Sequence, residues 1–405
     1  MGKNQDKEEG SLSPNSKAVI SLDEKFVMHT YSRFPVVPVK GKGVKVWDCD
    51  GKEYIDCVSG IAVLNVGHCH PRILNVLKEQ AEQLVHISNH FYIDQQAKAS
   101  EYLAKITPKK LEKTFWGNSG TEAVEAALKL AIKYKGKHEF IAAQGSFHGR
   151  SMGALATTWS ENYRAPYSPF GINVKFVPFN DLQAVKEAVS KDTAGIILEP
   201  VQGQGGVNIP SNGYLKAVRE LCDEKEIVLI FDEVQTGFGR TGKIWAGEHW
   251  GVNPDIMSLA KALGGGIATG ACIATEEIAK AFDHGAHGTT FGGNPLACAV
   301  ALEAMKIVVE ENLPERAANL GKKATNQLKE LKENVEAIKE VRGIGLLIGM
   351  EVSRDAKKLC LEMIKKGLLI TYTAKNVLRV IPPLVIEEGE LEKALSIITE
   401  TFTKY

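Results

Sequence analysis

The sequence predicts an α/β protein with a large, mostly parallel sheet and a smaller α+β part, and two observations lead to this prediction. From about residue 70 to 295, short apolar runs alternate with amphipathic stretches, as strands and helices do in a parallel sheet. Beyond residue 295 the pattern changes to long helical stretches followed by short strands. The length of 405 residues is enough for more than one domain.

The individual elements follow from the spacing of apolar residues. The stretch 213–225 is expected to be a helix, because Leu215, Val218, Leu221 and Cys222 fall on one face of it. Strands are expected at the apolar runs 193–198, 227–231 and 256–260. In the C-terminal part we expect helices at about 295–311 and 313–334, an apolar run at 341–352, a further helix, and short strands at about 368–372 and 377–381.

Four segments are expected along the chain. Residues 1–17 are polar, charged and without periodicity, which predicts a disordered tail. Residues 18–70 are expected to join the small part in space. Residues 71–295 then form the large domain, and residues 296–405 form the small C-terminal domain.

Composition excludes several classes of partner. The formal net charge is zero, so no field of one sign favours nucleic acid or a membrane surface. The sequence contains no run of 18 apolar residues, so no membrane-spanning helix is expected. The N-terminus lacks the apolar core of a signal peptide. The seven cysteines form no CxxC pair, which is typical of a reducing cytoplasm. His68 and His70 flank Cys69, but no second cluster lies nearby in sequence, and no metal is expected.

Three predicted strands are each followed by an ionisable residue. Glu199, Asp232 and Lys261 directly follow the runs TAGIIL, IVLIF and IMSLA. The carboxyl ends of parallel strands form the ligand crevice, so the three side chains should converge there. Lys261 lies between an apolar strand and ALGGG, a setting that can desolvate an amine and lower its pKa.

A predicted helix N-terminus supplies an anion site. GNSG at 117–120 precedes a helical stretch, and Ser119 and Glu122 have the spacing of a capping box. The backbone N–H groups of Ser119, Gly120 and Thr121 would then point at a bound phosphate. A lysine, a carboxylate and a phosphate cradle together suit pyridoxal 5′-phosphate, which needs an amine for its aldehyde, a partner for its ring nitrogen and donors for its phosphate.

The chain resembles the class III aminotransferases, in particular their acetylornithine aminotransferase branch, over about residues 26–395. Motifs that carry the resemblance are TYSRFP (30–35), NSGTEAVEAALKLA (118–131), SFHGR (146–150), EPVQGQGG (199–206), LIFDEVQTGFGRTG (229–242), AKALGGG (260–266) and HGTTFGGNPLACAVA (287–301). The resemblance implies fold type I of the pyridoxal-phosphate-dependent transferases and a cytoplasmic homodimer that acts in arginine biosynthesis.

The resemblance also implies roles at the cofactor. Lys261 would bind the cofactor covalently and move a proton, and Asp232 would bond the pyridinium nitrogen. Gln235 would bond the ring oxygen, and Phe147 would stack on the ring. Glu199 is a further residue of the cofactor site. Ser119, Gly120 and Thr121 would hold the phosphate, and Thr290 would reach the phosphate of the neighbouring subunit, giving a homodimer with shared sites.

At the substrate, the resemblance implies that Arg150 and Arg379 bind carboxylates and that Tyr31 lines the pocket. Two positions depart from the family pattern. Gln204 replaces a glutamate that pairs the C-terminal arginine, and Ile61 replaces a tyrosine of the ornithine branch. Gln204 would leave Arg379 free for carboxylates and would penalise a cationic substrate arm.

The first reading of the activity is transfer of the terminal amine of N-acetylornithine, or of a similar N-acylated diamino acid, to 2-oxoglutarate. The products would be a semialdehyde and glutamate. The alternative is a 4-aminobutyrate or other ω-amino acid aminotransferase. A racemase or aminomutase on the same scaffold is a third reading, and a non-enzymatic binding protein is disfavoured because Lys261 and Asp232 are both retained.

Overall fold

A computed structural model describes residues 12–108 and 110–403. Its largest sheet has the strand order β4-β10-β9-β8-β7-β5-β6. These strands are β4 (Leu111–Gly117), β5 (Glu139–Ala143), β6 (Asn173–Val177), β7 (Thr193–Leu198), β8 (Val228–Asp232), β9 (Ile256–Leu259) and β10 (Gly270–Thr275). All neighbouring pairs from β9 to β6 are parallel, and only β10 runs antiparallel to its neighbours. The predicted mostly parallel α/β sheet is confirmed.

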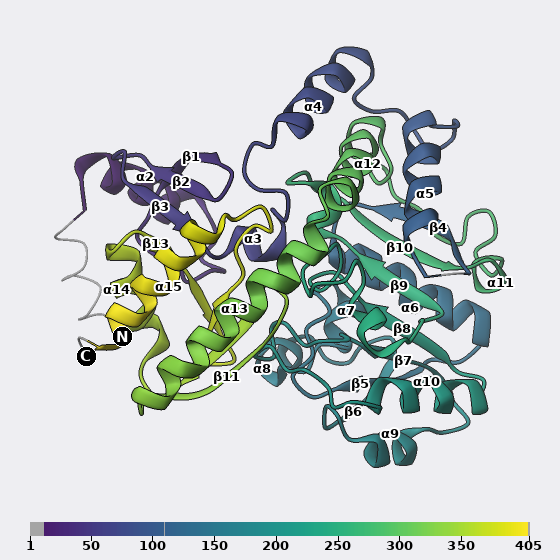
Figure 1. The fold of residues 1–405 in the computed structure, drawn as a ribbon. Helices are drawn as coiled ribbons and strands as arrows, with labels where there is room; N and C mark the ends of the chain where they lie inside the picture. The colour runs from purple at the N-terminus through teal and green to yellow at the C-terminus, as the bar shows by residue number, and fades with distance from the viewer. Residues whose placement is uncertain (1–11, 109, 404–405) are drawn as a thin grey trace.

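Helices cover both faces of this sheet (Figure 1). Apolar residues of α6 (Gly120–Lys135) form one core with β5, β7 and β8, and those of α10 (Tyr214–Glu224) form another core with the same strands. The strands are buried on both sides, which explains their nearly continuous apolar sequences. The remaining helices of this region are α4 (Pro71–Gln83), α5 (Asp94–Ile106), α7 (Met152–Ala156), α8 (Glu161–Arg164), α9 (Leu182–Ala188) and α11 (Glu276–Ala279).

Two smaller four-stranded sheets use the two ends of the chain. In one, β1 (Pro38–Lys42), β2 (Lys45–Asp48) and β3 (Glu53–Asp56) are completed by β13 (Leu368–Leu369), which pairs with β3 in parallel. The other has the order β11-β12-β15-β14. Its strands are β11 (Ile338–Ile344), β12 (Leu347–Val352), β14 (Thr371–Thr373) and β15 (Val377–Val380). In Figure 1 the purple N-terminal strands lie beside the yellow C-terminal helices.

The C-terminal helices match the sequence pattern closely. They are α12 (Pro295–Glu310), α13 (Leu313–Asn334), α14 (Ala356–Lys365) and α15 (Glu388–Thr403). The apolar run 341–352 belongs to an antiparallel hairpin, because Gly345 adopts a φ of +57° and reverses the chain. The stretch 368–372 divides between two sheets. The domain boundaries at residues 70 and 295 stay predictions.

The predicted N-terminal tail needs a correction. Residues 14–17, expected to be disordered, form the first turn of α2 (Pro14–Phe26). The Ser13 hydroxyl accepts the backbone N–H of Ser16 at 3.1 Å, and proline occupies the first helical position. The helix is fixed further by Asp50, whose carboxylate accepts from Ser13 and Ser16. Residues 1–11 lie outside the described residues.

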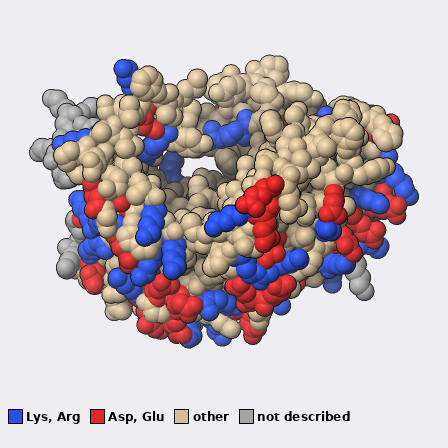
Figure 2. Space-filling view, turned by 90° about the horizontal axis from the view of Figure 1, so that it is seen from above, with Lys and Arg blue, Asp and Glu red and all other residues tan. Residues whose placement is uncertain are grey.

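On the face seen in Figure 2, basic and acidic side chains are interspersed around a central hollow. In the part of the chain that the structure describes, no helix is both long and apolar enough to cross a membrane.

Candidate active site

Four neighbouring parallel strands end at one edge of the large sheet, and each delivers functional side chains there. The strands stand in the order β9-β8-β7-β5. Lys261 follows β9, Asp232 ends β8, Glu199 follows β7, and Phe147 lies in the loop after β5. The charges of Asp232 and Glu199 both act on the Lys261 amine. The predicted convergence of these three residues is therefore found in the structure.

Lys261 is held in a strained and desolvated position. Its backbone has a φ of +50°, a left-handed conformation that costs a non-glycine residue about 1–3 kcal/mol. Burial of the amine, followed by the positive charge of Arg379, lowers the pKa of Lys261 to about 8. A substantial fraction of the amine is then neutral near physiological pH and is able to attack a carbonyl carbon.

His148, which was not predicted from the sequence, contacts the predicted cofactor residue Asp232. Its Nδ1 lies 2.7 Å from Oδ2 of Asp232, and both side chains are buried. The other oxygen, Oδ1, accepts the backbone N–H of Val234 at 3.0 Å. His148 Nε2 has no hydrogen-bond partner within the described residues. The sequence signal was its place beside Phe147 in SFHGR, because adjacent loop residues can face opposite sides of one site.

Glu199 links two loops of the site. Its two carboxylate oxygens accept the backbone N–H groups of Phe147 and Gly203, each at 3.0 Å. Burial raises the pKa of Glu199 to about 7, against the opposing influence of His148. Glu199 therefore fixes the positions of Phe147 and of the loop that carries Gln204.

The N-terminus of α6 is formed as the sequence predicts, but the capping box is only half made. The Ser119 hydroxyl accepts the N–H of Glu122 at 3.3 Å. The Glu122 carboxylate does not return to Ser119. It accepts from the backbone and side-chain amides of Asn118 instead. The first-turn N–H groups of Gly120 and Thr121 still have no intrahelical acceptor.

The Gln235 side chain lies against Gly203, and the hydroxyl of Thr121 is already engaged. A Cβ on Gly203 would lie 1.5 Å from Oε1 of Gln235, so a side chain at position 203 would displace the Gln235 amide. The Thr121 hydroxyl lies 2.5 Å from that of Ser151 and accepts the Ser151 N–H at 3.1 Å. Thr121 can therefore serve an anion through its backbone N–H more readily than through its side chain.

Arg379 comes from β15 of the C-terminal sheet and is only 2% exposed. Its Nε and Nη1 have no hydrogen-bond partner in residues 12–108 and 110–403. Burial lowers the pKa of Arg379 to about 10, and the charge of Glu199 opposes this shift. A buried guanidinium with unpaired N–H groups is suited to bind a carboxylate. The Gln204 carbonyl accepts from the Thr373 hydroxyl, which fixes the Gln204 loop to the same part of the chain.

Several residues predicted at the substrate, and Thr290, predicted at the phosphate of the neighbouring subunit, are exposed in the single chain. The Arg150 guanidinium lies 3.7 Å from the ring centroid of Tyr163 and 5.5 Å from that of Phe147. Thr290 is exposed, and Tyr31 is 75% exposed with Arg33 over its ring. No hydrogen bond joins Tyr31 or Thr290 to Lys261 among the described residues. Ile61 is 41% exposed and lies in α3 (Ser59–Ala62), which packs against the turn Lys261–Gly264.

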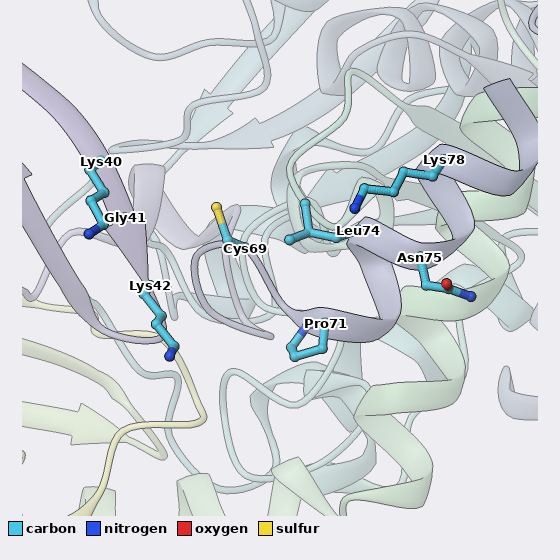
Figure 3. A pocket seen from close by; sticks show the side chains of 8 residues that line it. All are labelled: Lys40, Gly41, Lys42, Cys69, Pro71, Leu74, Asn75 and Lys78. Carbon is cyan, nitrogen blue, oxygen red and sulfur yellow. The ribbon is translucent and has the colours of Figure 1, made fainter. Parts of the chain in front are cut away.

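The two histidines around Cys69 have structural partners. His68 Nε2 lies 2.8 Å from Asp56 Oδ2, and His70 Nδ1 accepts the N–H of Arg72 at the start of α4. No cluster of three metal-ligating side chains is found in the described part of the chain. A separate cavity of about 440 Å³ lies between β1 and α4, with Cys69 on its wall (Figure 3). Its lining residues are Lys40, Gly41, Lys42, Cys69, Pro71, Leu74, Asn75 and Lys78, none of which belongs to the Lys261 site.

The residues present fit pyridoxal 5′-phosphate. The desolvated Lys261 amine matches its aldehyde, and the Asp232 carboxylate, fixed by His148, matches its ring nitrogen. The free N–H groups at the start of α6 match its phosphate. A Cβ on Gly120 would lie 2.9 Å from a methyl group of Val234, so this glycine keeps the helix start close to the loop after Asp232.

Comparisons with known proteins agree with this chemistry. The family profile described as Aminotransferase class-III matches residues 26–402. An acetylornithine aminotransferase of Methanopyrus kandleri is 53% identical over 93% of this chain and 96% of its own length. The crystal structure of acetylornithine aminotransferase from Elizabethkingia anophelis has a TM-score of 0.86 and 37% identity, covering 97% of this chain and 100% of its own. A structure of ornithine aminotransferase from Toxoplasma gondii, with PLP at its active site, has a TM-score of 0.94 and 35% identity, covering 100% and 98%.

Proposed function

Because this chain belongs to the class-III aminotransferases, which use pyridoxal 5′-phosphate, we propose that it transfers the terminal amino group of N-acetylornithine to 2-oxoglutarate. The products are the corresponding semialdehyde and glutamate. The observation that carries the transaminase chemistry is the convergence of Lys261, Asp232 and Glu199 at one sheet edge, with the unpaired guanidinium of Arg379 nearby. The name shared by close relatives supports the choice of N-acetylornithine.

The cofactor supplies an electron-withdrawing ring for the carbon that loses its proton. In the proposed mechanism, Lys261 would hold the cofactor, and once the lysine is released its Nζ would carry a proton to and from the substrate carbon. Asp232, oriented by His148, would keep its negative charge toward the ring nitrogen. Phe147 would lie against the ring, Gln235 would donate to the ring oxygen, and the start of α6 would hold the phosphate through Ser119, Gly120 and Thr121.

The charges near the substrate support an acylated donor. Arg379 and Arg150 are cationic, and no carboxylate forms an ion pair with either within the described residues. Ornithine would bring an α-ammonium group into this positive environment. In N-acetylornithine that nitrogen is an amide, so the repulsion is absent while the carboxylate remains for an arginine. Ornithine is the second candidate, because solved ornithine aminotransferases have the same fold.

A panel of amino donors with 2-oxoglutarate tests the proposed function. N-acetylornithine is expected to give the highest kcat/KM for glutamate formation, ahead of ornithine and 4-aminobutyrate. A higher kcat/KM for 4-aminobutyrate would show that 4-aminobutyrate, and not N-acetylornithine, is the donor. Racemisation without any requirement for 2-oxoglutarate would show that the enzyme is a racemase and not an aminotransferase.

Gln204 is expected to tune the choice between donors. Gln204→Glu would add a carboxylate to the loop that Thr373 joins to the sheet carrying Arg379, so the kcat/KM for ornithine should rise relative to that for glutamate, on the order of tenfold. The negative charge of Glu199 already acts on Arg379, and this limits the increase in the kcat/KM for ornithine. N-acetylornithine, without the α-ammonium, should change least. Steady-state kinetics gives the ratio of mutant to wild-type kcat/KM for ornithine, glutamate and N-acetylornithine. Gln204→Met controls for the shape of the side chain. If all three substrates change together, Gln204 has no part in discrimination.

We also propose that the enzyme is a cytoplasmic homodimer that shares residues between its sites. The exposed position of Thr290 supports this, because its side chain is accessible to a neighbouring subunit. Large apolar side chains are also exposed at Phe291, next to Thr290, and at Phe91 and Tyr92, close to Asn89, which donates to the Gly292 carbonyl. The cytoplasmic location is supported by seven free cysteines.

Mixing two inactive variants tests the shared site. Lys261→Ala and Thr290→Ala proteins should each be impaired, and subunit exchange should create one site with both residues intact. Recovered activity should approach about a quarter of wild type, since half of the dimers are mixed and each has one complete site. Sedimentation measures the oligomeric state. A fully active monomer, or no recovery after demonstrated exchange, would exclude the shared site.

A further inference from the structure

The segment Ser59–Ala62 forms a left-handed helical turn. Its residues have φ values of +47°, +64°, +64° and +63°, and only the second is glycine. Ile61 is β-branched, and a β-branched residue in this region is a genuine outlier because its Cβ crowds the following carbonyl. Such strain persists only where the surroundings impose it, and it collects at functional sites.

Hydrogen bonds hold this turn on both sides. Oδ1 of Asp56 accepts the N–H groups of Val58 and Ser59, at 2.8 and 2.9 Å. The Ser59 hydroxyl donates to the carbonyl of Ile381 at 2.7 Å. Arg240 Nη2 lies 3.4 Å from the same hydroxyl and donates to Oδ1 of Asn65 at 2.6 Å.

The Arg240 guanidinium connects three distant segments. Besides Ser59 and Asn65, it donates through Nη1 to the carbonyls of Leu346 and Pro382, at 2.9 and 2.6 Å. Arg240 itself lies in the loop that follows Asp232 and Gln235, and it is fully buried. Pro382 comes two residues after β15, the strand that carries Arg379. One side chain therefore ties the left-handed turn and the end of the Arg379 strand to the loop beside the cofactor residues.

The left-handed turn lies against the Lys261 turn. α3 contacts Lys261–Gly264, and a Cβ on Gly266 would approach Cδ2 of Leu64 to 3.3 Å. The positive charge of Arg240 is also one of the influences that lower the pKa of Lys261. Ile61, partly exposed, thus projects from a strained backbone segment that packs against the turn Lys261–Gly264.

We propose that Arg240 is a positioning residue, which imposes the left-handed turn at Ser59–Ala62 and thereby sets Ile61 as a wall of the amino-donor site. The proposal rests on the proposed function, because it takes Lys261 as the reacting amine. Arg240 does not touch the donor. It acts on donor binding by fixing the backbone from which Ile61 projects.

Two variants of Ile61 separate strain from contact. Ile61→Gly and Ile61→Ala both remove the side chain, but only glycine relaxes a φ of +64°. The Ile61→Gly holoenzyme should melt a few degrees above Ile61→Ala, while both should show the same raised KM for the donor. Equal melting temperatures would mean that the turn is not strained. An unchanged donor KM in both variants would mean that Ile61 does not face the donor.

Variants of the clamp test Arg240 itself. Arg240→Lys, and the milder Ser59→Ala, should raise the donor KM on the order of tenfold, with kcat within about twofold and the absorbance of the bound cofactor unchanged. Ser59→Ala keeps the test decisive if Arg240→Lys does not fold. A lower melting temperature with unchanged donor KM would reduce Arg240 to a structural role and overturn the proposal. Wild-type enzyme assayed alongside reports separately on the proposed function, which fails if no amino donor reacts.

Discussion

Lys261→Ala is expected to reduce turnover by about 10²–10⁴-fold or more, because the substitution removes both the nucleophilic amine and the proton carrier. Borohydride treatment of the wild-type holoenzyme should fix the cofactor to Lys261 alone, as read by peptide mass spectrometry. The variant should bind the cofactor without a covalent bond. The exposed Lys280 provides a matched control, since Lys280→Ala should leave turnover unchanged. Labelling at any other lysine would remove Lys261 from its proposed role.

The lowered pKa of Lys261 also predicts how the rate of covalent capture of the cofactor depends on pH. The neutral amine is the nucleophile, and it predominates above its pKa, which burial lowers to about 8. Covalent capture of the cofactor by the cofactor-free protein should therefore accelerate as the pH rises through about 8 and then level off. An ordinary exposed lysine would still be gaining rate above pH 10. Stopped-flow absorbance follows the capture, and a profile that rises only above pH 10 would contradict the desolvated amine.

Asp232→Asn is expected to lower single-turnover rates severely while leaving the fold intact. An uncharged amide no longer favours a protonated ring nitrogen, so the ring withdraws electrons less strongly. The buried Asp232 carboxylate also receives the His148 hydrogen bond, so the substitution changes that pair as well. Rapid-mixing measurements with the donor alone isolate this half of the reaction. Near-normal rates would show that Asp232 does not serve the ring nitrogen.

His148 offers a matched comparison for Asp232. His148→Gln should orient the carboxylate less well without removing its charge, so its rate should fall between those of wild type and Asp232→Asn. The melting temperature of each variant separates this effect from general destabilisation. If His148→Gln is as slow as Asp232→Asn, the orientation of the carboxylate matters as much as its charge.

Regular local patterns determined the larger part of the fold in advance. The strands β7, β8 and β9 were predictable because they are buried on both sides, which requires nearly continuous apolar runs. The helices α12 and α13 were predictable from length and periodicity. The ionisable residues Glu199, Asp232 and Lys261 could be placed together because parallel strands share the edge at which they end.

Contacts between distant segments decided the parts of the site that local sequence patterns do not predict. No spacing rule joins His148 to Asp232, which is 84 residues away, or Arg240 to Pro382, which is 142 residues away. The positive φ of Ile61 and of Lys261 also runs against local preference, and only surrounding hydrogen bonds and packing impose it.

The sequence by itself determined the reactive groups and the sheet edge that carries them, because side-chain chemistry and strand periodicity are local properties. Tertiary structure alone decided their working state. Burial lowers the pKa of Lys261. It also leaves two nitrogens of Arg379 without hydrogen-bond partners in the described residues. Both effects depend on segments brought together from both ends of the chain. The guanidinium of Arg240 holds several of those segments together, so the surroundings of Lys261 are a property of the folded chain.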